Sequence, residues 1–201
     1  MLFPIRDDVP AERMPIVNWL LIGANLLVFL YMATQLPDAA AQQQFVEQYG
    51  LVPGNVRFGL AHPGLALDAP WQFARDVVRP LFTAMFLHGS WAHLLGNVWF
   101  LVIFGDNVEG RLGHVKYLVF YFLCGLVAWS LHIASIPAEE VARTSQGTLA
   151  LVRNPGLFVP AVGASGAIAG VLGAYTLLFP RARVTTFFLL PIFFFEVRDW
   201  R

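Results

Sequence analysis

The sequence predicts an all-α fold, a polytopic membrane helix bundle with four full transmembrane helices plus a partial fifth. Of its 201 residues, 57% are hydrophobic and 13% are charged, whereas soluble domains carry about 25% charged residues. The mean hydropathy is +0.61, and the apolar residues gather in long runs. Thirteen basic and thirteen acidic residues cancel. The composition therefore indicates a lipid bilayer as the surroundings and no nucleic acid as a partner.

Four apolar runs are long enough to cross about 30 Å of hydrocarbon at about 1.5 Å per residue, so we expect four membrane helices. They cover residues 16–34, 80–105, 115–136 and 158–179. A fifth run, residues 184–195, is too short for a full span. The first run also allows a signal peptide, but its leader mixes acids with bases and the run is long for that role. A retained helix is the favoured alternative.

The chain is expected to form one transmembrane domain over residues 1–201, incomplete at its C-terminus, with a large outer loop at residues 37–79. The two short turns expected between helices, 106–114 and 180–183, hold a group of basic residues: Arg111, Arg181 and Arg183. Short loops weigh most in the positive-inside rule. We therefore expect a multi-pass membrane protein with its N-terminus on the cytoplasmic side.

Among the polar residues inside these apolar runs, three stand out by their pattern, and polar groups are costly there unless they are buried and hydrogen-bonded. His93 and Asn97 stand four apart in HGSWAHLLGN, which places both on one face of a helix. Ser165 stands among glycines in VGASGAIAG, in the outer half of the fourth run. The second helix thus offers a donor pair, and the fourth offers a serine at comparable depth.

Acyl transfer is the chemistry that these groups can perform. A serine becomes a nucleophile when a base takes its proton, and the tetrahedral intermediate needs donors aimed at its oxyanion. His93 and Asn97 can supply side-chain donors. Gly163 lets the backbone bend, so that the amide of Ser165 can point at the same oxygen. If a helix begins at Ser165, its free amides and dipole also favour an anion there.

A purely structural interpretation remains open. Gly166 and Gly170 form a GxxxG pattern, which lets membrane helices approach closely. A serine in such a helix often bonds back to a carbonyl one turn earlier, and a pair such as His93 and Asn97 often joins two helices. The combination of both motifs favours catalysis over packing.

Two common hydrolase patterns are absent from the sequence. The GxSxG elbow would need glycine at the position of Ala167. There is no HExxH motif, and His88 and His93 have no carboxylate at a metal-ligand spacing. We therefore expect neither a metal nor another cofactor.

With FLHGSWAHLLGNVWFLVIFGDNVEGRLG, VGASGAIAGVLGAY and the PIRDD leader, the chain resembles the rhomboid family of intramembrane serine proteases, of the bacterial type. The resemblance covers nearly the whole chain and implies a six-helix bundle with a catalytic serine below the outer surface. It implies that Ser165 is the nucleophile, that His93 and Asn97 line the oxyanion hole, and that Gly163 is the first glycine of GxSG.

The resemblance also implies supporting roles. His88 would steady the outer loop, and Glu109 and Arg111 fall in the GDNVEGRLG turn, where we expect a structural ion pair. The family often carries Trp-Arg before the second helix, where this sequence has Arg79-Pro80.

The family's base is a histidine in an AHxxG pattern on the sixth helix, and this pattern does not occur in the 201 residues. We assign no base, and we expect the chain as given to be truncated before that helix and inactive or incomplete. The leading hypothesis is a serine endopeptidase, acting by a Ser-His dyad on membrane-protein substrates whose transmembrane segment is helix-destabilised. The alternative is a non-catalytic rhomboid-like protein that binds membrane helices.

Overall fold

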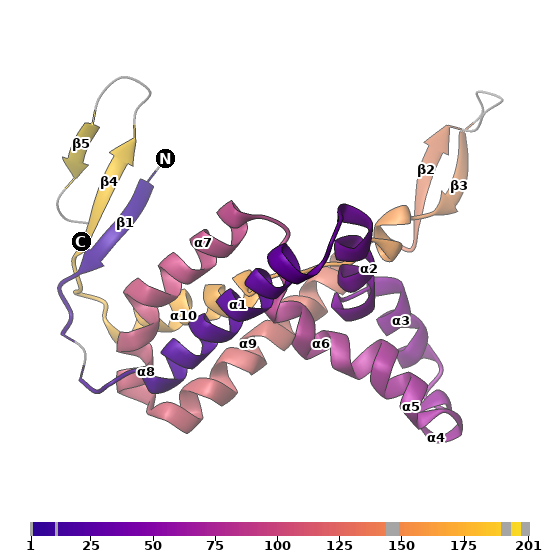
Figure 1. Ribbon diagram of the computed structural model, residues 1–201, viewed down its shortest axis with the longest axis horizontal. Coiled ribbons are helices and arrows are strands. Elements are labelled where there is room, and N and C mark those ends of the chain that lie inside the picture. Colours follow the sequence, from indigo (N-terminus) through magenta and orange to yellow (C-terminus); the bar gives the residue numbers. More distant parts are fainter. Residues whose placement is uncertain (1, 11, 144–148, 190–193, 198–201) are drawn as a thin grey trace. The chain divides into compact units, whose positions relative to one another are not determined.

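The computed structural model describes residues 2–10, 12–143, 149–189 and 194–197. Two long helices, α1 (Ile16–Gln35) and α9 (His114–Ser135), are long and apolar enough to cross a membrane. Both match the expected spans to within one residue, because an uninterrupted apolar run of this length has no competing structure in lipid. These two helices, labelled in Figure 1, support an integral membrane protein.

The second expected span, 80–105, is not one continuous helix. A helical stretch of π-helix η1 (Ala74–Val78), α6 (Arg79–Thr83) and the 3₁₀ turn η2 (Ala84–Phe86) ends before Leu87. Helix resumes in α7 (Trp91–Phe100) and continues through π-helix η3 (Leu101–Gly105) and α8 (Asp106–Leu112). The break falls at Gly89-Ser90, because Ser90 is extended and its side chain caps α7. The two stretches form a bent pair, which adds a third candidate span only if the pair is counted as one.

The fourth expected span, 158–179, is helical only in its second part. A 3₁₀ turn, η4 (Pro155–Phe158), is followed by non-helical residues, and α10 (Ser165–Leu178) begins seven residues later. Leu51 and Ala161 exchange backbone hydrogen bonds of 3.0 and 2.8 Å, and Pro160 has no amide to donate to a helix. The extended pairing therefore replaces the first turns of the expected helix.

The prediction of a partial fifth helix over 184–195 is wrong for the residues that the structure describes there. Residues Val184–Leu189 form strand β4, which pairs antiparallel with β1 (Leu2–Asp7) on one side and with β5 (Phe194–Val197) on the other. The run VTTFFL is rich in β-branched and aromatic residues, which favour strands. The fold is therefore mostly helical with small sheets, and the count of four full helices plus a partial fifth is not confirmed.

The chain divides into two compact units. The first contains residues 1–27, 90–125 and 165–201, and the second contains 28–89 and 126–164. Within the first unit, α10 packs against α7, η3 and α8. Each of the long helices α1 and α9 contributes residues to both units.

Short helices fill the segment 37–79, which belongs to the second unit. They are α2 (Ala39–Tyr49), α3 (Pro53–Ala61), α4 (Leu65–Asp68), α5 (Pro70–Phe73) and η1. Asp38 caps α2 by accepting from the Ala41 amide at 2.8 Å, and Pro53 occupies the first turn of α3. A hairpin of β2 (Glu139–Arg143) and β3 (Leu149–Arg153) belongs to the same unit.

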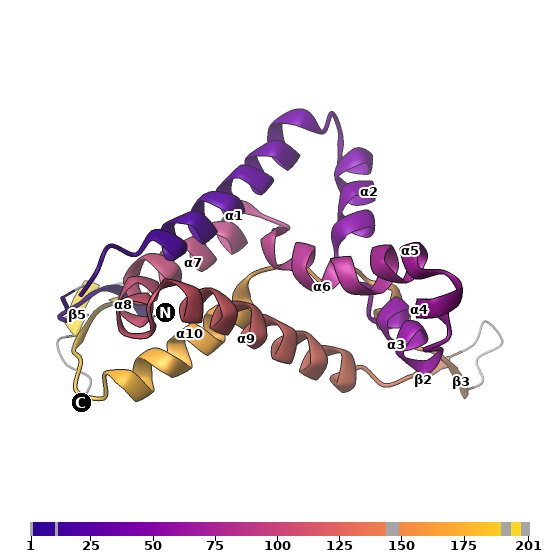
Figure 2. The ribbon, with the colours of Figure 1, turned by 90° about the horizontal axis from the view of Figure 1, so that it is seen from below.

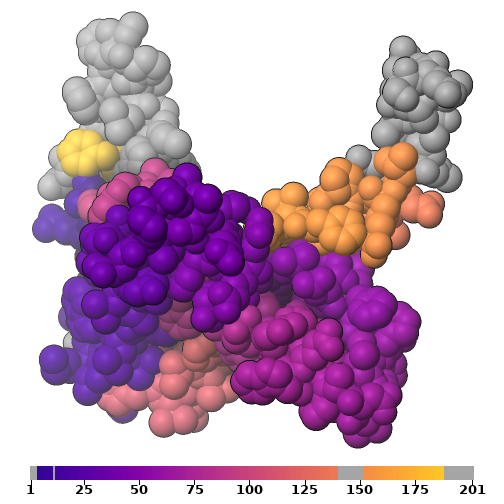
Figure 3. All heavy atoms as spheres, turned by 45° about the vertical axis from the view of Figure 1, so that its right-hand side comes forward, coloured from indigo at the N-terminus to yellow at the C-terminus, as the bar shows by residue number. Residues whose placement is uncertain are grey.

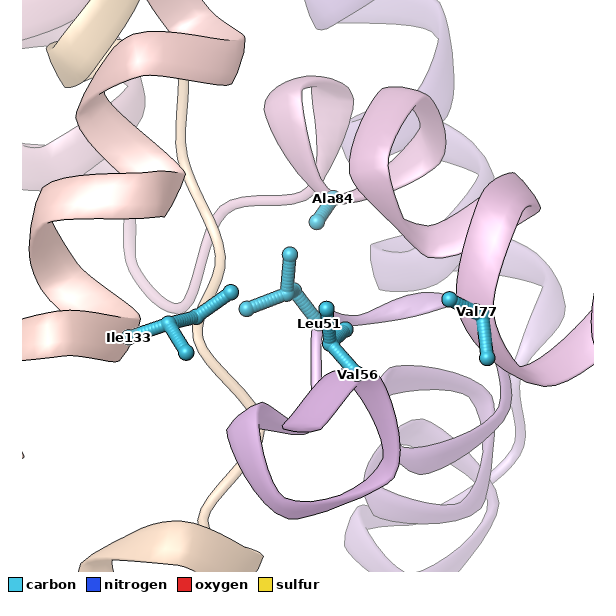
Figure 4. Close-up of a cluster of buried hydrophobic side chains, with 5 residues drawn as sticks. All are labelled: Leu51, Val56, Val77, Ala84 and Ile133. Atoms are coloured by element: carbon cyan, nitrogen blue, oxygen red, sulfur yellow. The ribbon is translucent and has the colours of Figure 1, made fainter. Parts of the chain in front are cut away.

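A cluster of buried apolar side chains holds the second unit together (Figure 4). Leu51, Val56, Val77, Ala84 and Ile133 come from the segment 37–79, from η2 and from α9. Arg79 also ties this segment down, because its guanidinium donates to the Gln48 carbonyl at 2.6 Å and lies over the Tyr49 ring. Arg79 therefore helps to fix the C-terminal end of α2 against α6.

Candidate active site

The helix α7 presents the histidine and asparagine that the sequence singles out. Ser90 accepts a hydrogen bond from the His93 amide at 3.2 Å and so caps the helix. His93 is half-buried, and Asn97 is 8% exposed. Both lie in one continuous α-helix, four residues apart, so they share a face as expected.

The serine stands at the first residue of α10. Its side chain is exposed. Elsewhere, Ser130 and Thr176 lie inside helices, and each donates to the carbonyl four residues earlier at 2.9 Å. Ser165 makes no such bond among the described residues. Because α10 begins here, its first amides have no partner within the helix. The condition for favouring an anion, a helix that begins at Ser165, is therefore met.

The glycines around Ser165 divide between two roles. Gly163 has a φ of 122°, which side chains rarely adopt, and its amide donates to the Ala84 carbonyl at 2.8 Å. Gly170 packs against α9, where an added Cβ would overlap the side chain of Cys124. The packing interpretation of GxxxG therefore holds for Gly170, while Gly163 is required by the backbone turn that precedes α10.

The structure brings α7 and α10 together within one compact unit. Ser165, His93 and Asn97 thus belong to two packed helices of the same unit, which Figure 2 shows from below. Gly163 and His88 belong to the second unit, and His88 is fully buried there.

The remaining histidines have local partners of their own. His62 contacts the Phe58 carbonyl at 2.9 Å, and His114 contacts the Glu109 carboxylate at 2.5 Å. His132 lies near the C-terminal end of α9, with its ring against that of Trp129. All three contacts join residues that lie within five positions of each other along the chain.

Glu109 plays a role that sequence reasoning missed. Its carboxylate is almost fully buried and accepts from the amides of Val17 and Asn18 at 2.9 and 2.6 Å. It therefore caps the N-terminus of α1 as well as contacting His114. Arg111 pairs instead with Glu12 at 3.1 Å. These two separate contacts replace the expected ion pair between Glu109 and Arg111. The available signal for the cap was an acidic residue that is buried near the start of a helix.

Asp7 is a second anchor that the sequence did not reveal. At the end of β1, its Oδ2 accepts from the Tyr175 hydroxyl of α10 at 2.6 Å and from the Asn107 amide of α8 at 2.7 Å. The Trp99 indole of α7 donates to the Pro4 carbonyl in the same strand at 2.6 Å. The N-terminal strand therefore contacts α7, α8 and α10 in the first unit.

Asp7 should make stability depend on pH. Burial raises the pKa of its carboxyl above the ordinary value of 3.8, against the opposing hydrogen bond from Tyr175. The folded state then binds this proton more tightly than the unfolded state, so the free energy of unfolding should fall as pH rises above 3.8 and level off above the folded-state pKa. Asp7→Asn should flatten this decline in thermal unfolding measured in detergent from pH 4 to 7.

The matched control is Asp68→Asn, at an exposed position in α4 of the other unit. It should leave the decline unchanged. An equal decline in wild type and Asp7→Asn would contradict the assigned role of Asp7.

The sequence is similar to a known protein family and to one curated protein. A family model described as "Rhomboid domain" matches residues 71–197. The chain is similar to RHOMBOID-like protein 12, mitochondrial, of Arabidopsis thaliana, with 28% identity over 138 residues, covering 69% of this chain and 40% of the relative. The chain therefore spans about two fifths of the relative's length. No solved structure matches.

Proposed function

Because the chain belongs to the rhomboid family, we propose that it is an intramembrane serine endopeptidase that cleaves transmembrane segments of other membrane proteins. One observation carries the proposal. The exposed hydroxyl of Ser165 lies at the first residue of α10, and α10 packs against the helix that bears His93 and Asn97. A nucleophile at a helix N-terminus has an electrostatic partner for the oxyanion that it generates.

In the proposed reaction, the Ser165 oxygen attacks the scissile carbonyl carbon while its proton passes to a base. The carbonyl oxygen becomes an oxyanion, held by the Ser165 amide together with His93 and Asn97. Removal of one such donor commonly costs about 10²–10³ in kcat. Collapse of the intermediate breaks the C–N bond, and the amine leaves with the proton. Water then hydrolyses the acyl-enzyme and restores the serine.

We assign the base of this dyad mechanism to none of the residues 1–201. No metal or cofactor takes part in the proposed steps. The substrate helix has to unwind locally to expose its carbonyl, and an unwound backbone is tolerated in a membrane only where its polar groups find partners. We therefore propose membrane-protein substrates whose transmembrane segment carries helix-destabilising residues.

We further propose that the protein crosses a bacterial inner membrane several times with its N-terminus in the cytoplasm, as one transmembrane domain over residues 1–201. The basic residues of the short turns support this orientation. The segment 37–79 then lies on the outer side.

A labelling experiment tests the proposal. The purified protein in detergent is treated with a fluorophosphonate probe, which reacts with activated serines. We expect labelling of a full-length version that carries the base histidine as well as residues 1–201, and none of its Ser165→Ala variant. Ser130→Ala is the matched control, because Ser130 is bonded back to the Leu126 carbonyl, and it should label normally. Persistent labelling of Ser165→Ala would exclude Ser165 as the nucleophile.

The second candidate is a non-catalytic protein that binds membrane helices, and the separate partners of His62, His114 and His132 favour it. It predicts no labelling and co-purification of intact single-span proteins. The source DNA beyond the codon for Arg201 distinguishes the two further. An apolar helix with AHxxG encoded there would supply the base, and its absence would favour binding.

A further inference from the structure

A surface cavity in the second unit combines charges of both signs. It has a volume of about 400 Å³ and lies where η4 and the hairpin strands meet α3, in orange and violet in Figure 3. Its lining includes Arg57, Arg153, Glu139 and His62, together with Phe58 and Leu157. All of these residues belong to the same compact unit. The proposed protease reaction uses none of them.

The end of the membrane helix α9 sets the depth of this cavity. The Arg57 guanidinium donates to the carbonyl oxygens of Ile133 and Ile136, and α9 ends at Ser135. The 22 residues of α9 extend about 33 Å at 1.5 Å per residue, close to the hydrocarbon thickness of a bilayer. Arg57 therefore lies at the level where lipid headgroups begin.

The cavity's two arginines are positioned to receive an anion. Arg57 is held by the α9 carbonyls, and Arg153 lies over the ring of Phe158 at 4.7 Å. Neither forms an ion pair with a carboxylate within the described parts of the chain. A guanidinium pairs with two phosphate oxygens at once and keeps its charge at every physiological pH.

The cavity also holds a carboxylate beside these arginines. Glu139 is the antiparallel partner of Arg153 across the β2–β3 hairpin, so the two side chains project from the same face. A site with two guanidinium groups and one carboxylate is complementary to a ligand that carries a phosphate next to an ammonium group.

The surroundings of the cavity favour a lipid over a soluble phosphate. Large apolar side chains of α3 to α5 are exposed, including Leu60, Leu67 and Trp71 at 68%, 86% and 80%. Exposed apolar residues beside basic ones are typical of a segment that lies in the membrane interface, and tryptophan is enriched there. Acyl chains can lie along this surface while the headgroup occupies the cavity.

We propose that this cavity binds the headgroup of phosphatidylethanolamine, with the phosphate at Arg57 and Arg153 and the ammonium group at Glu139. The inference rests on the membrane location of the protein and not on its catalytic assignment. The site would hold the segment 37–79 and the β2–β3 hairpin to the bilayer surface.

The test measures thermal unfolding of the full, delipidated chain in detergent, with titrated lipid. A ligand that binds only the folded state raises the free energy of unfolding by RT ln(1 + L/Kd), where L is the free ligand concentration, so the unfolding midpoint rises with the ligand concentration relative to Kd. Phosphatidylethanolamine should raise the midpoint of wild type, and phosphatidylglycerol, which lacks the amine, should bind more weakly. Diacylglycerol and inorganic phosphate should give no comparable rise. Equal rises with inorganic phosphate, or with diacylglycerol, would overturn the proposal.

Variants separate the two halves of the site. Arg153→Gln should weaken phosphatidylethanolamine binding about tenfold, the typical effect of losing one charged hydrogen-bonding partner. Glu139→Gln should remove the preference for phosphatidylethanolamine over phosphatidylglycerol. Arg75→Gln is the control, because Arg75 pairs with Asp76 outside this cavity. Unchanged affinity in Arg153→Gln, or an unchanged preference in Glu139→Gln, would contradict the assignment. Arg57 is left intact, because its loss would also remove the contacts to α9.

Discussion

Replacing Glu109 with leucine should destabilise the first unit more than any other single carboxylate substitution. Glu109 accepts hydrogen bonds from the amides of Val17 and Asn18 at 2.9 and 2.6 Å. Without the carboxylate, these two amides at the start of α1 would have no acceptor. The bond from the Asn18 amide is buried and that from the Val17 amide is partly buried. A buried donor without a partner costs about 1–3 kcal/mol, so the loss should be at least of that size. The carboxylate's favourable interaction with the helix dipole would also disappear.

Thermal and denaturant unfolding in detergent measure this loss. Glu109→Gln keeps one acceptor oxygen and should lose less than Glu109→Leu. Glu12→Gln is the surface counterpart, because Glu12 and Arg111 form an exposed pair, and it should remain within about 1 kcal/mol of wild type. Similar unfolding midpoints for Glu109→Leu and Glu12→Gln would show that the cap carries no stability.

Gly105→Ala should be strongly destabilising in this unit. An alanine Cβ at this position in η3 would lie 2.8 Å from the Tyr117 hydroxyl and still closer to the Asn18 side-chain oxygen. These two groups are hydrogen-bonded to each other at 2.9 Å, and Asn18 also donates to the Leu101 carbonyl at 2.8 Å. The methyl group would therefore separate α1, η3 and α9 where they meet.

Overpacking of this kind costs about 1–3 kcal/mol, and loss of the buried hydrogen bond adds about 0.5–1.5 kcal/mol. Gly23→Ala, in α1, is the matched control, because its Cβ would meet no atom within 4 Å. It should be neutral or slightly stabilising, since alanine is the better helix former. Tyr117→Phe removes the hydrogen bond without adding volume, and so separates the two contributions. Equal stabilities of Gly105→Ala and Gly23→Ala would contradict the close approach.

The elements that the sequence predicted correctly are those whose structure is set by residues close together in the chain. Helices α1 and α9 follow from continuous apolar runs, so the sequence located both to within one residue. The late start of α10 depends on contacts such as Leu51 with Ala161, which are distant in sequence. The break before α7 has a local cause, the Ser90 cap, but it lies inside a run that is apolar enough to suggest one continuous span. Strand β4 was mistaken for a helix because a short apolar run allows either structure until its partner, β1, is known.

The candidate site divides in the same way. The four-residue spacing of His93 and Asn97 is a local pattern, and both residues lie in α7. Gly163, two residues before Ser165, is also a local signal, and it marks the turn that leads into α10. The roles of Glu109 and Asp7 depend on partners 91 and 168 residues away. No spacing rule relates a carboxylate to an amide or hydroxyl at that distance, so these anchors required the tertiary structure.

The pairing of β1 with β4 has a consequence for the order of events during synthesis. The hydrogen bond from the Arg183 amide to Asp8 closes a loop of 175 residues. At about 5–20 residues per second, the ribosome needs about 9–35 s to produce that many residues. Helix α1 can enter the bilayer during this interval, but the segment of β1 has no partner strand until β4 has been synthesised. An unpaired strand edge is a template for pairing with other chains. The nascent protein should therefore be most vulnerable to mispairing before β4 emerges, and a slow codon cluster just upstream of Val184 should lower the yield of folded protein.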